Sequence, residues 1–264
     1  MKYVLVTGAY GGMGKRAVEN FRAQGYKVFA LDKQVGEAQD GVIPVQADVT
    51  DEQSLLQALE LVRQTSDELY AIVHFAGIYM LDSLVELKSE AFERIFKINL
   101  FGVFCVNKVF LPLLQKGSKI LITTSELAPL DPLPFTGIYA VSKSALDKYA
   151  YSLRMELQLL GIDVCVLRAG AVQTDMLGVS TKALKTFCEN TKLYTCNAKR
   201  FKDIVERVEA RCIPPEKLAK KAGKIVRKKR VKFAYTINRN SLLLLLNVLP
   251  KRFQFWVIKR ILKK

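Results

Sequence analysis

A glycine-rich turn between the first predicted strand and the first predicted helix restricts this chain to a small group of folds. Residues 3–7 are apolar and largely β-branched, and they lead directly into the turn Gly8-Ala9-Tyr10-Gly11-Gly12-Met13-Gly14. An apolar pattern at helical spacing follows and ends at Gly25. A strand, a glycine turn and a helix in this order are typical of α/β proteins that bind dinucleotides.

The glycines of this turn have separate tasks in such a site. Gly8 permits a tight exit from the strand, Gly12 lets the backbone approach a pyrophosphate, and Gly14 lets the helix pack closely on the sheet. Gly11 adds freedom to the loop, and Met13 lies at the helix N-terminus, where the backbone favours an anion. We therefore expect these five residues to contact a cofactor.

Asp32 ends a second predicted strand and favours NAD over NADP. A carboxylate at this position can accept hydrogen bonds from the adenosine ribose hydroxyls and would repel a 2′-phosphate. Lys33, the next residue, would partly offset that repulsion. The alternative is that Asp32 is a solvated residue in a turn.

The chain of 264 residues is half apolar and alternates strand with helix patterns. Alternation of this kind predicts a Rossmann-like, doubly wound parallel sheet with helices on both faces. We expect one catalytic domain over residues 1–235 and a basic, amphipathic helical extension over 236–264. Strands are predicted near 2–7, 27–31, 42–46, 69–75, 118–124, 162–168 and 231–235, and helices near 12–24, 51–64, 89–114, 138–160, 199–211 and 215–228.

Tyr139 and Lys143 are four residues apart, which places a phenol beside an ammonium on one face of a helix. A neighbouring cation favours the phenolate and so suits the tyrosine for proton transfer. Taken alone, the spacing also fits an exposed tyrosine beside a solvated lysine. The order of motifs along the chain decides between these interpretations.

That order resembles the short-chain dehydrogenase/reductases of the single-domain type, over about residues 1 to 235. TGAYGGMG at positions 7–14 matches the TGxxxGxG pattern of that family. The other matching residues are Asp48, Val49, Ala76, Gly77, Asn99, Ser125, Tyr139, Lys143, Val172 and Thr174. The chain departs from the pattern in three places: HFAG replaces NNAG at 74–77, one extra residue separates Ser125 from Tyr139, and Ala169 replaces a proline.

The resemblance implies a role for each of these residues. Tyr139 would exchange a proton with a carbonyl or alcohol oxygen, while Lys143 would lower the pKa of Tyr139 and bind the nicotinamide ribose. Ser125 would hold the substrate oxygen, and Asn99 would fix a water in the proton path. Cofactor contacts are implied for Asp48, Val49, Ala76, Gly77, Val172 and Thr174, and also for Tyr139 and Lys143.

The segment after Thr174 is weakly periodic and corresponds to the substrate lid of the family. We expect Met176, Leu177, Leu184 and Phe187 to line an apolar pocket there. The alternative is a plain surface helix that packs these side chains on the sheet.

His74, the only histidine, follows an apolar strand pattern. A position at the cofactor edge or at a hydrogen-bonded strand end is favoured over a catalytic base or a metal ligand. The five cysteines are odd in number and include no CxxC pair. This usage favours reduced thiols in a cytoplasmic protein, and no metal is expected. Met1 opens almost directly into a strand, so no secretion signal is predicted.

The charge of the chain is concentrated at its C-terminal end. Residues 216–264 carry sixteen Lys or Arg and one acid, Glu216, so they hold +15 of the total charge of +16. Pro250 divides the last part into a leucine-rich segment at 242–249 and a basic amphipathic segment at 251–264. Both segments are too short to span a bilayer.

Two interpretations of this extension remain open. It can lie on an anionic membrane surface, or it can cover the pocket or a subunit contact with its charges solvated. Nucleic acid is not an expected partner, because no recognition module accompanies the cations.

We therefore expect an NAD-dependent alcohol dehydrogenase or ketoreductase, a homo-oligomer, that acts on a lipophilic, steroid-like or other lipid-like alcohol or ketone. It is expected in the cytoplasm, at the membrane periphery if the extension binds lipid. The alternatives are reduction of a polar carbonyl, such as a sugar or acyl intermediate, and a low-turnover NAD-binding protein at a membrane.

Overall fold

The sheet of this protein has seven strands, all parallel, in the order β3-β2-β1-β4-β5-β6-β7. The computed structural model describes residues 1–209 and 211–263, without the side chains of 175–181 and 206–209. The strands are β1 (Tyr3–Thr7), β2 (Lys27–Asp32), β3 (Val42–Gln46), β4 (Leu69–His74), β5 (Leu114–Ser125), β6 (Asp163–Ala169) and β7 (Ala234–Ile237). The strand order reverses direction between β1 and β4, and such switch points are where open α/β sheets bind ligands.

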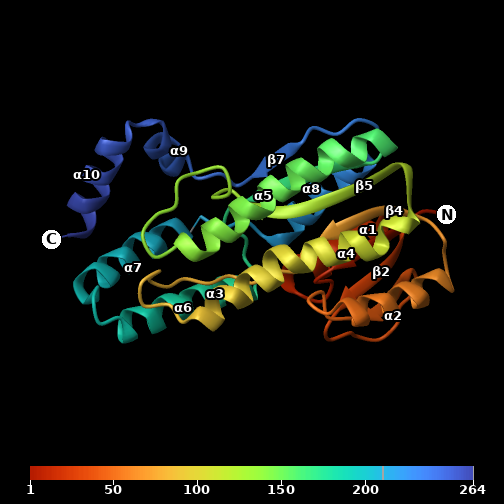
Figure 1. Ribbon diagram of the computed structural model, residues 1–264, viewed down its shortest axis with the longest axis horizontal. Coiled ribbons are helices and arrows are strands. Elements are labelled where there is room, and N and C mark those ends of the chain that lie inside the picture. The colour runs from red at the N-terminus through yellow and green to blue at the C-terminus, as the bar shows by residue number, and fades with distance from the viewer. Residues whose placement is uncertain (210, 264) are drawn as a thin grey trace.

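Helices cover both faces of the sheet, as predicted (Figure 1). The helices are α1 (Gly12–Ala23), α2 (Glu52–Arg63), α3 (Ser89–Phe96), α4 (Gly102–Phe110), α5 (Gly137–Leu157), α6 (Asp175–Asn190), α7 (Thr195–Glu209), α8 (Pro215–Arg227), α9 (Ser241–Val248) and α10 (Lys251–Leu262). Helices α1 and α8 pack on one face, and α2, α4 and α5 pack on the other. The Rossmann-like fold class is therefore confirmed.

The first strand illustrates why its sequence is continuously apolar. Val4 and Val6 belong to the core on the α1 side, whereas Leu5 belongs to the core on the α5 side. All three side chains are fully buried. A strand buried on both faces has no solvated side, so it shows no alternation of polar and apolar residues.

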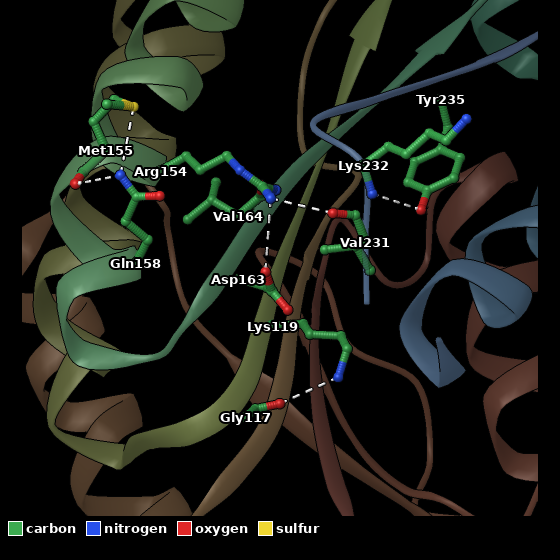
Figure 2. Close-up of polar contacts among 10 residues, drawn as sticks. All are labelled: Gly117, Lys119, Arg154, Met155, Gln158, Asp163, Val164, Val231, Lys232 and Tyr235. Atoms are coloured by element: carbon green, nitrogen blue, oxygen red, sulfur yellow. Dashed lines mark hydrogen bonds and ion pairs between the residues drawn. The ribbon is translucent and has the colours of Figure 1, made fainter. Parts of the chain in front are cut away.

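The last strand begins later than its sequence pattern predicts, at Ala234 rather than 231. Side chains bind part of the preceding backbone (Figure 2). The carbonyl of Phe233 still accepts a backbone hydrogen bond from the amide of Val166 at 2.7 Å. Arg154 of α5 donates to the carbonyl oxygens of Val164 and Val231, at 2.6 and 3.1 Å, and the amide of Lys232 donates to the Tyr235 hydroxyl. β7 then continues to Ile237, two residues past the predicted domain limit.

A continuous helical stretch, Ser89–Leu113, is long and apolar enough to cross a membrane by length and composition alone. It includes α3, a π-helical turn at Lys97–Phe101, and α4. Val106, Val109 and Phe110 of this stretch are buried in the main core. Its apolar composition is therefore accounted for by packing against the sheet.

The C-terminal helices α9 and α10 lie at the end of the molecule opposite the N-terminus, beside α7 (Figure 1). Asn240 caps α9, because its Oδ1 accepts hydrogen bonds from the amides of Leu242 and Leu243. Two contacts tie this pair of helices to the loop after β5. The amide of Asp131 donates to Asn247 Oδ1 at 2.7 Å, and the Asp131 carboxylate pairs with Lys251.

Candidate active site

The glycine turn packs so closely against its neighbours that side chains would not fit. Gly8 has a φ of +65°, and a Cβ built on it would lie 2.6 Å from the amide nitrogen of Ala76. A Cβ on Gly12 would lie 2.7 Å from Cβ of Thr174. The turn therefore meets the segments after β4 and β6, which brings three of the predicted cofactor-contact segments together.

Asp32 faces this turn from the end of β2. Its Oδ2 accepts a hydrogen bond from the amide of Tyr10 at 3.0 Å, and its Oδ1 accepts one from the amide of Lys33 at 2.7 Å. The ammonium of Lys33 is paired with Asp48 at 2.9 Å. Because Lys33 is paired with Asp48, it is less able to offset the repulsion between Asp32 and the 2′-phosphate of NADP.

Tyr139 and Lys143 lie on the first turns of α5, with Lys143 Nζ 5.8 Å from the centre of the Tyr139 ring. The helix is fixed to β6 by a bidentate ion pair between Asp147 and Arg168, at 3.0 and 2.6 Å. The hydroxyl of Thr124 also donates to Asp147. These bonds hold α5 in register with the carboxyl end of β5, where Ser125 is the last residue.

The pKa of Tyr139 is shifted upward, whereas the sequence predicted that Lys143 would lower it. Burial raises this pKa above its ordinary value of 10, a hydrogen bond with Ser125 lowers it in part, and neighbouring Tyr79 raises it further. Burial also lowers the pKa of Lys143 to about 8. Desolvation thus outweighs the attraction between phenolate and ammonium, and the phenol of the free protein is a proton donor at neutral pH.

Asn99 lies in the π-helical turn and is fully buried. Its Nδ2 donates to the carbonyl of Ile78 and to the hydroxyl of Ser142, and its Oδ1 accepts from the amide of Ile78 at 2.8 Å. A Cβ on Gly77 would lie 3.1 Å from this oxygen and 3.4 Å from Lys143 Nζ. Asn99 therefore fixes the backbone after β4 and is not among the described residues that line the cavity beside Tyr139. Its predicted role in holding a water stays a prediction.

His74 is a buried residue at the end of β4. Its Nε2 lies 2.9 Å from Oδ1 of Asn107, whose amide donates to the hydroxyl of Tyr149. Burial lowers the pKa of His74 to about 4, so the ring is neutral and Nε2 is the donor. Of the two favoured interpretations, the hydrogen-bonded strand end describes this residue.

A cavity of about 570 Å³ opens beside these side chains. Its walls include the predicted site residues Met13, Gly77, Ser125, Tyr139, Lys143, Val172 and Thr174. Much of the remaining wall is apolar and comes from α7, α9 and α10. The extension therefore covers the pocket, which is one of the two arrangements left open by the sequence.

Leu184 and Phe187, two of the four predicted pocket residues of α6, are not among the described residues that line this wall. Leu184 and Phe187 are buried with Phe135 and Phe201 in an apolar cluster, and the rings of Phe135 and Phe187 are 4.6 Å apart. This cluster adjoins the cavity, because Phe201 also lines the wall. The weakly periodic segment thus forms a helix that packs inward on neighbouring side chains. The side chains of Met176 and Leu177 lie outside the described part of the structure.

Sequence reasoning missed three contributors to the cavity. The ring of Tyr79 lies 4.8 Å from the ring of Tyr139 and is tilted by 54° to it. Glu126 follows Ser125 directly, and the leucines of α9 form part of the wall. The position of Glu126 beside a predicted catalytic serine was a usable signal. The leucine run carried no indication of which part of the fold it would contact.

Comparisons with known proteins agree with this geometry. A family model described as short chain dehydrogenase matches residues 2–185. The NADPH-dependent 1-acyldihydroxyacetone phosphate reductase of Schizosaccharomyces pombe is 30% identical over 194 residues, which cover 71% of this chain. Estradiol 17-beta-dehydrogenase 2 of Mus musculus is 32% identical over 189 residues, which cover 67% of this chain.

The chain spans 64% and 50% of the lengths of these two relatives. Among solved structures, a short chain dehydrogenase family protein from Francisella tularensis has a TM-score of 0.74. The match covers 90% of this chain and 97% of that one, at 22% identity. At that identity the likeness supports the fold, and the family model supports the assignment of the chain.

Proposed function

Because this chain belongs to the short-chain dehydrogenase family, we propose that it is an NAD(H)-dependent oxidoreductase for an apolar, steroid-like or other lipid-like, secondary alcohol or ketone. One observation carries the proposal. Tyr139, Lys143 and Ser125 share a cavity whose far wall is built from leucine, isoleucine and valine side chains. Such a wall binds an alkyl chain or a fused ring system better than a sugar, because it cannot hydrogen-bond hydroxyl groups.

The glycine turn is suited to a dinucleotide, since side chains at Gly8 and Gly12 would collide with Ala76 and Thr174. Asp32, Asp48 and Val49 would hold its adenosine part, and Thr174, Val172 and Lys143 its nicotinamide end. When bound, the nicotinamide supplies or accepts the hydride.

The protein's own groups would handle the proton and the substrate oxygen. Tyr139, protonated in the free protein, would donate a proton to the carbonyl oxygen during reduction and remove one from the alcohol during oxidation. Ser125 would hold that oxygen by a hydrogen bond, and the Lys143 ammonium would stabilise the phenolate that forms. Apolar side chains from α9 and α10 would exclude water from the reacting centre.

We expect Asp32→Ala to reduce the preference for NADH over NADPH about tenfold. The ribose hydroxyls of NADH lose a hydrogen-bond acceptor, and the 2′-phosphate of NADPH is no longer repelled by a carboxylate. Asp32→Asn should have a similar effect while keeping an acceptor for the amide of Tyr10. Dissociation constants of both cofactors, measured by fluorescence titration, test this. Asp40→Ala, which removes an exposed carboxylate paired with Lys27, is the matched control. An unaltered preference in both Asp32 variants would exclude the ribose role.

We further propose that the outer face of α9 and α10 places this otherwise cytoplasmic protein on an anionic membrane surface. Val248, Phe255 and Trp256 are 82%, 67% and 58% exposed. Residues 241–263 contain five Lys or Arg and no acid. Apolar side chains beside cations are the combination that anionic lipid binds, and each cation contributes about 1 kcal/mol.

Replacing both Phe255 and Trp256 with serine is expected to reduce the fraction that sediments with phosphatidylserine vesicles about tenfold, since the inserted apolar area is lost. Leu159→Ser, at an 83% exposed leucine after α5, should bind as the unaltered protein does. Vesicles of phosphatidylcholine alone provide the second comparison. Two outcomes would contradict a charge-dependent membrane face on α10. One is equal sedimentation of the unaltered protein with phosphatidylserine and phosphatidylcholine vesicles, and the other is equal sedimentation of the Phe255/Trp256 variant and the Leu159 variant.

A further inference from the structure

Glu126 is the only carboxylate among the described residues that line the cavity. It follows Ser125 in the sequence, and its amide donates to the carbonyl of Ala169 at 2.9 Å, so the loop begins beside the end of β6. Lys143 is the only other charged residue that the structure places in the cavity wall. A single negative charge therefore lies next to the reacting centre in apolar surroundings.

One oxygen of this carboxylate is used by the protein and the other is available. Oε2 accepts a hydrogen bond from the amide of Asn240 at 2.6 Å. Oε1 lies along Gly170, where an added Cβ would come within 3.1 Å of it, and no donor in the described part of the chain is hydrogen-bonded to it. The bond to Asn240 is a helix-capping contact, which the neutral oxygen of a glutamine would also provide.

The Glu126 carboxylate forms no ion pair among the described residues, although the nearby Arg239 attracts it. Burial is the main influence on Glu126 and raises its pKa, while the Asn240 hydrogen bond and the nearby Arg239 lower it. A partly buried charge is unfavourable unless a partner compensates it. Asn240 also caps α9 with its own side chain, so α9 does not need a formal charge at position 126.

We propose that Glu126 binds a primary ammonium group carried next to the reacting carbon of the substrate, which makes the substrate a long-chain amino ketone or amino alcohol. This inference rests on the oxidoreductase function proposed above. The carbonyl oxygen lies between Ser125 and Tyr139, the ammonium meets Oε1 of Glu126, and the alkyl chain extends along the leucines of α9. An anionic substituent at the same place is repelled. The ammonium takes no part in hydride or proton transfer, so the redox chemistry is unchanged.

The test compares two ketones that differ only in the amine, 2-aminododecan-3-one and dodecan-3-one, by NADH consumption at pH 7. The unaltered protein is expected to prefer the amino ketone in kcat/KM by about tenfold or more, mainly through KM. Glu126→Gln keeps the acceptor for Asn240 and removes the charge, so the ratio of the two kcat/KM values should fall about tenfold. No preference in the unaltered protein, with both ketones reduced, would overturn the inference and leave the oxidoreductase proposal intact.

The Asp131→Asn variant tests whether Glu126 acts by binding the substrate ammonium or only by holding the C-terminal helices in place. Asp131 belongs to the same loop and pairs with Lys251 of α10, but it does not line the cavity. The ratio should keep its original value in this variant. A fall of equal size in Asp131→Asn and Glu126→Gln would assign the effect to loosening of the helices and overturn the recognition role. Absence of turnover with either ketone would count against the oxidoreductase function itself.

Discussion

Replacing Tyr139 with phenylalanine is expected to lower kcat by about 10²- to 10⁴-fold, the range that positioned acid–base groups contribute. Tyr139 is partly buried, hydrogen-bonded to Ser125 and protonated in the free protein, so its phenol is the group in this cavity best placed to deliver a proton. Phenylalanine keeps the ring against Tyr79 and removes only the hydroxyl. Steady-state rates with NADH and a lipophilic ketone measure the loss.

The dissociation constant for NADH should change little in this variant, because the glycine turn and Asp32 are untouched. Tyr151→Phe is the matched control, since Tyr151 lies on the same helix with half of its surface exposed to solvent. Full activity of the Tyr139 variant would exclude its role in proton transfer. A loss of activity accompanied by an equal loss of NADH affinity would assign Tyr139 to cofactor binding instead.

The sequence predicted best those parts of the site that are formed by residues close together in the chain. The turn at 8–14 and the four-residue spacing of Tyr139 and Lys143 are local patterns, and local backbone geometry determines how their residues are presented. The residues of the sheet were also readable, because strands buried on both faces are continuous apolar runs. Two strand starts were predicted wrongly: β5 begins at Leu114 rather than 118, and β7 begins at Ala234 rather than 231. Before β7, Arg154 binds the carbonyl of Val231.

Properties that depend on burial or on distant contacts were not readable in this way. The helix spacing predicted a cation beside Tyr139, but the direction of its pKa is determined by desolvation from the surrounding fold. Leu184 and Phe187 were predicted to line a pocket, but they are buried against Phe135 and Phe201, which come from other segments. The bond between Glu126 and Asn240 joins residues 114 positions apart, which no local pattern indicates.

We propose that the extension at 241–263 combines the two roles that the sequence presented as alternatives, covering the pocket and contacting a membrane. Leu243 and Leu246 of α9 line the cavity, whereas Val248 of the same helix does not and is 82% exposed. Leu242 and Leu245 line the cavity and are also exposed by more than half, so they rim its mouth. A helix with both faces apolar can cover a substrate on one side and contact lipid on the other.

Replacing Leu243 and Leu246 together with asparagine is therefore expected to lower kcat/KM for a lipophilic ketone by roughly 100-fold. Each leucine contributes about 1.5 kcal/mol or more when an apolar ligand covers it, and an amide in its place must be desolvated. Both side chains are mostly buried in the free protein, so the unfolding temperature should also fall, and the rates are compared at a temperature at which both proteins are folded. Kinetics with ketones of increasing chain length measure the effect, which should grow with the length of the alkyl chain.

Val248→Asn provides the matched control on the same helix. It should leave kcat/KM for a soluble ketone unchanged and weaken sedimentation with phosphatidylserine vesicles, since its side chain lies outside the cavity. Enzyme kinetics would then report on the face of α9 that lines the cavity, and vesicle sedimentation on its exposed face. If the Leu243 and Leu246 variant kept its activity on long-chain ketones, the wall formed by α9 would not contact substrate. The apolar residues of the extension would then serve the membrane face alone.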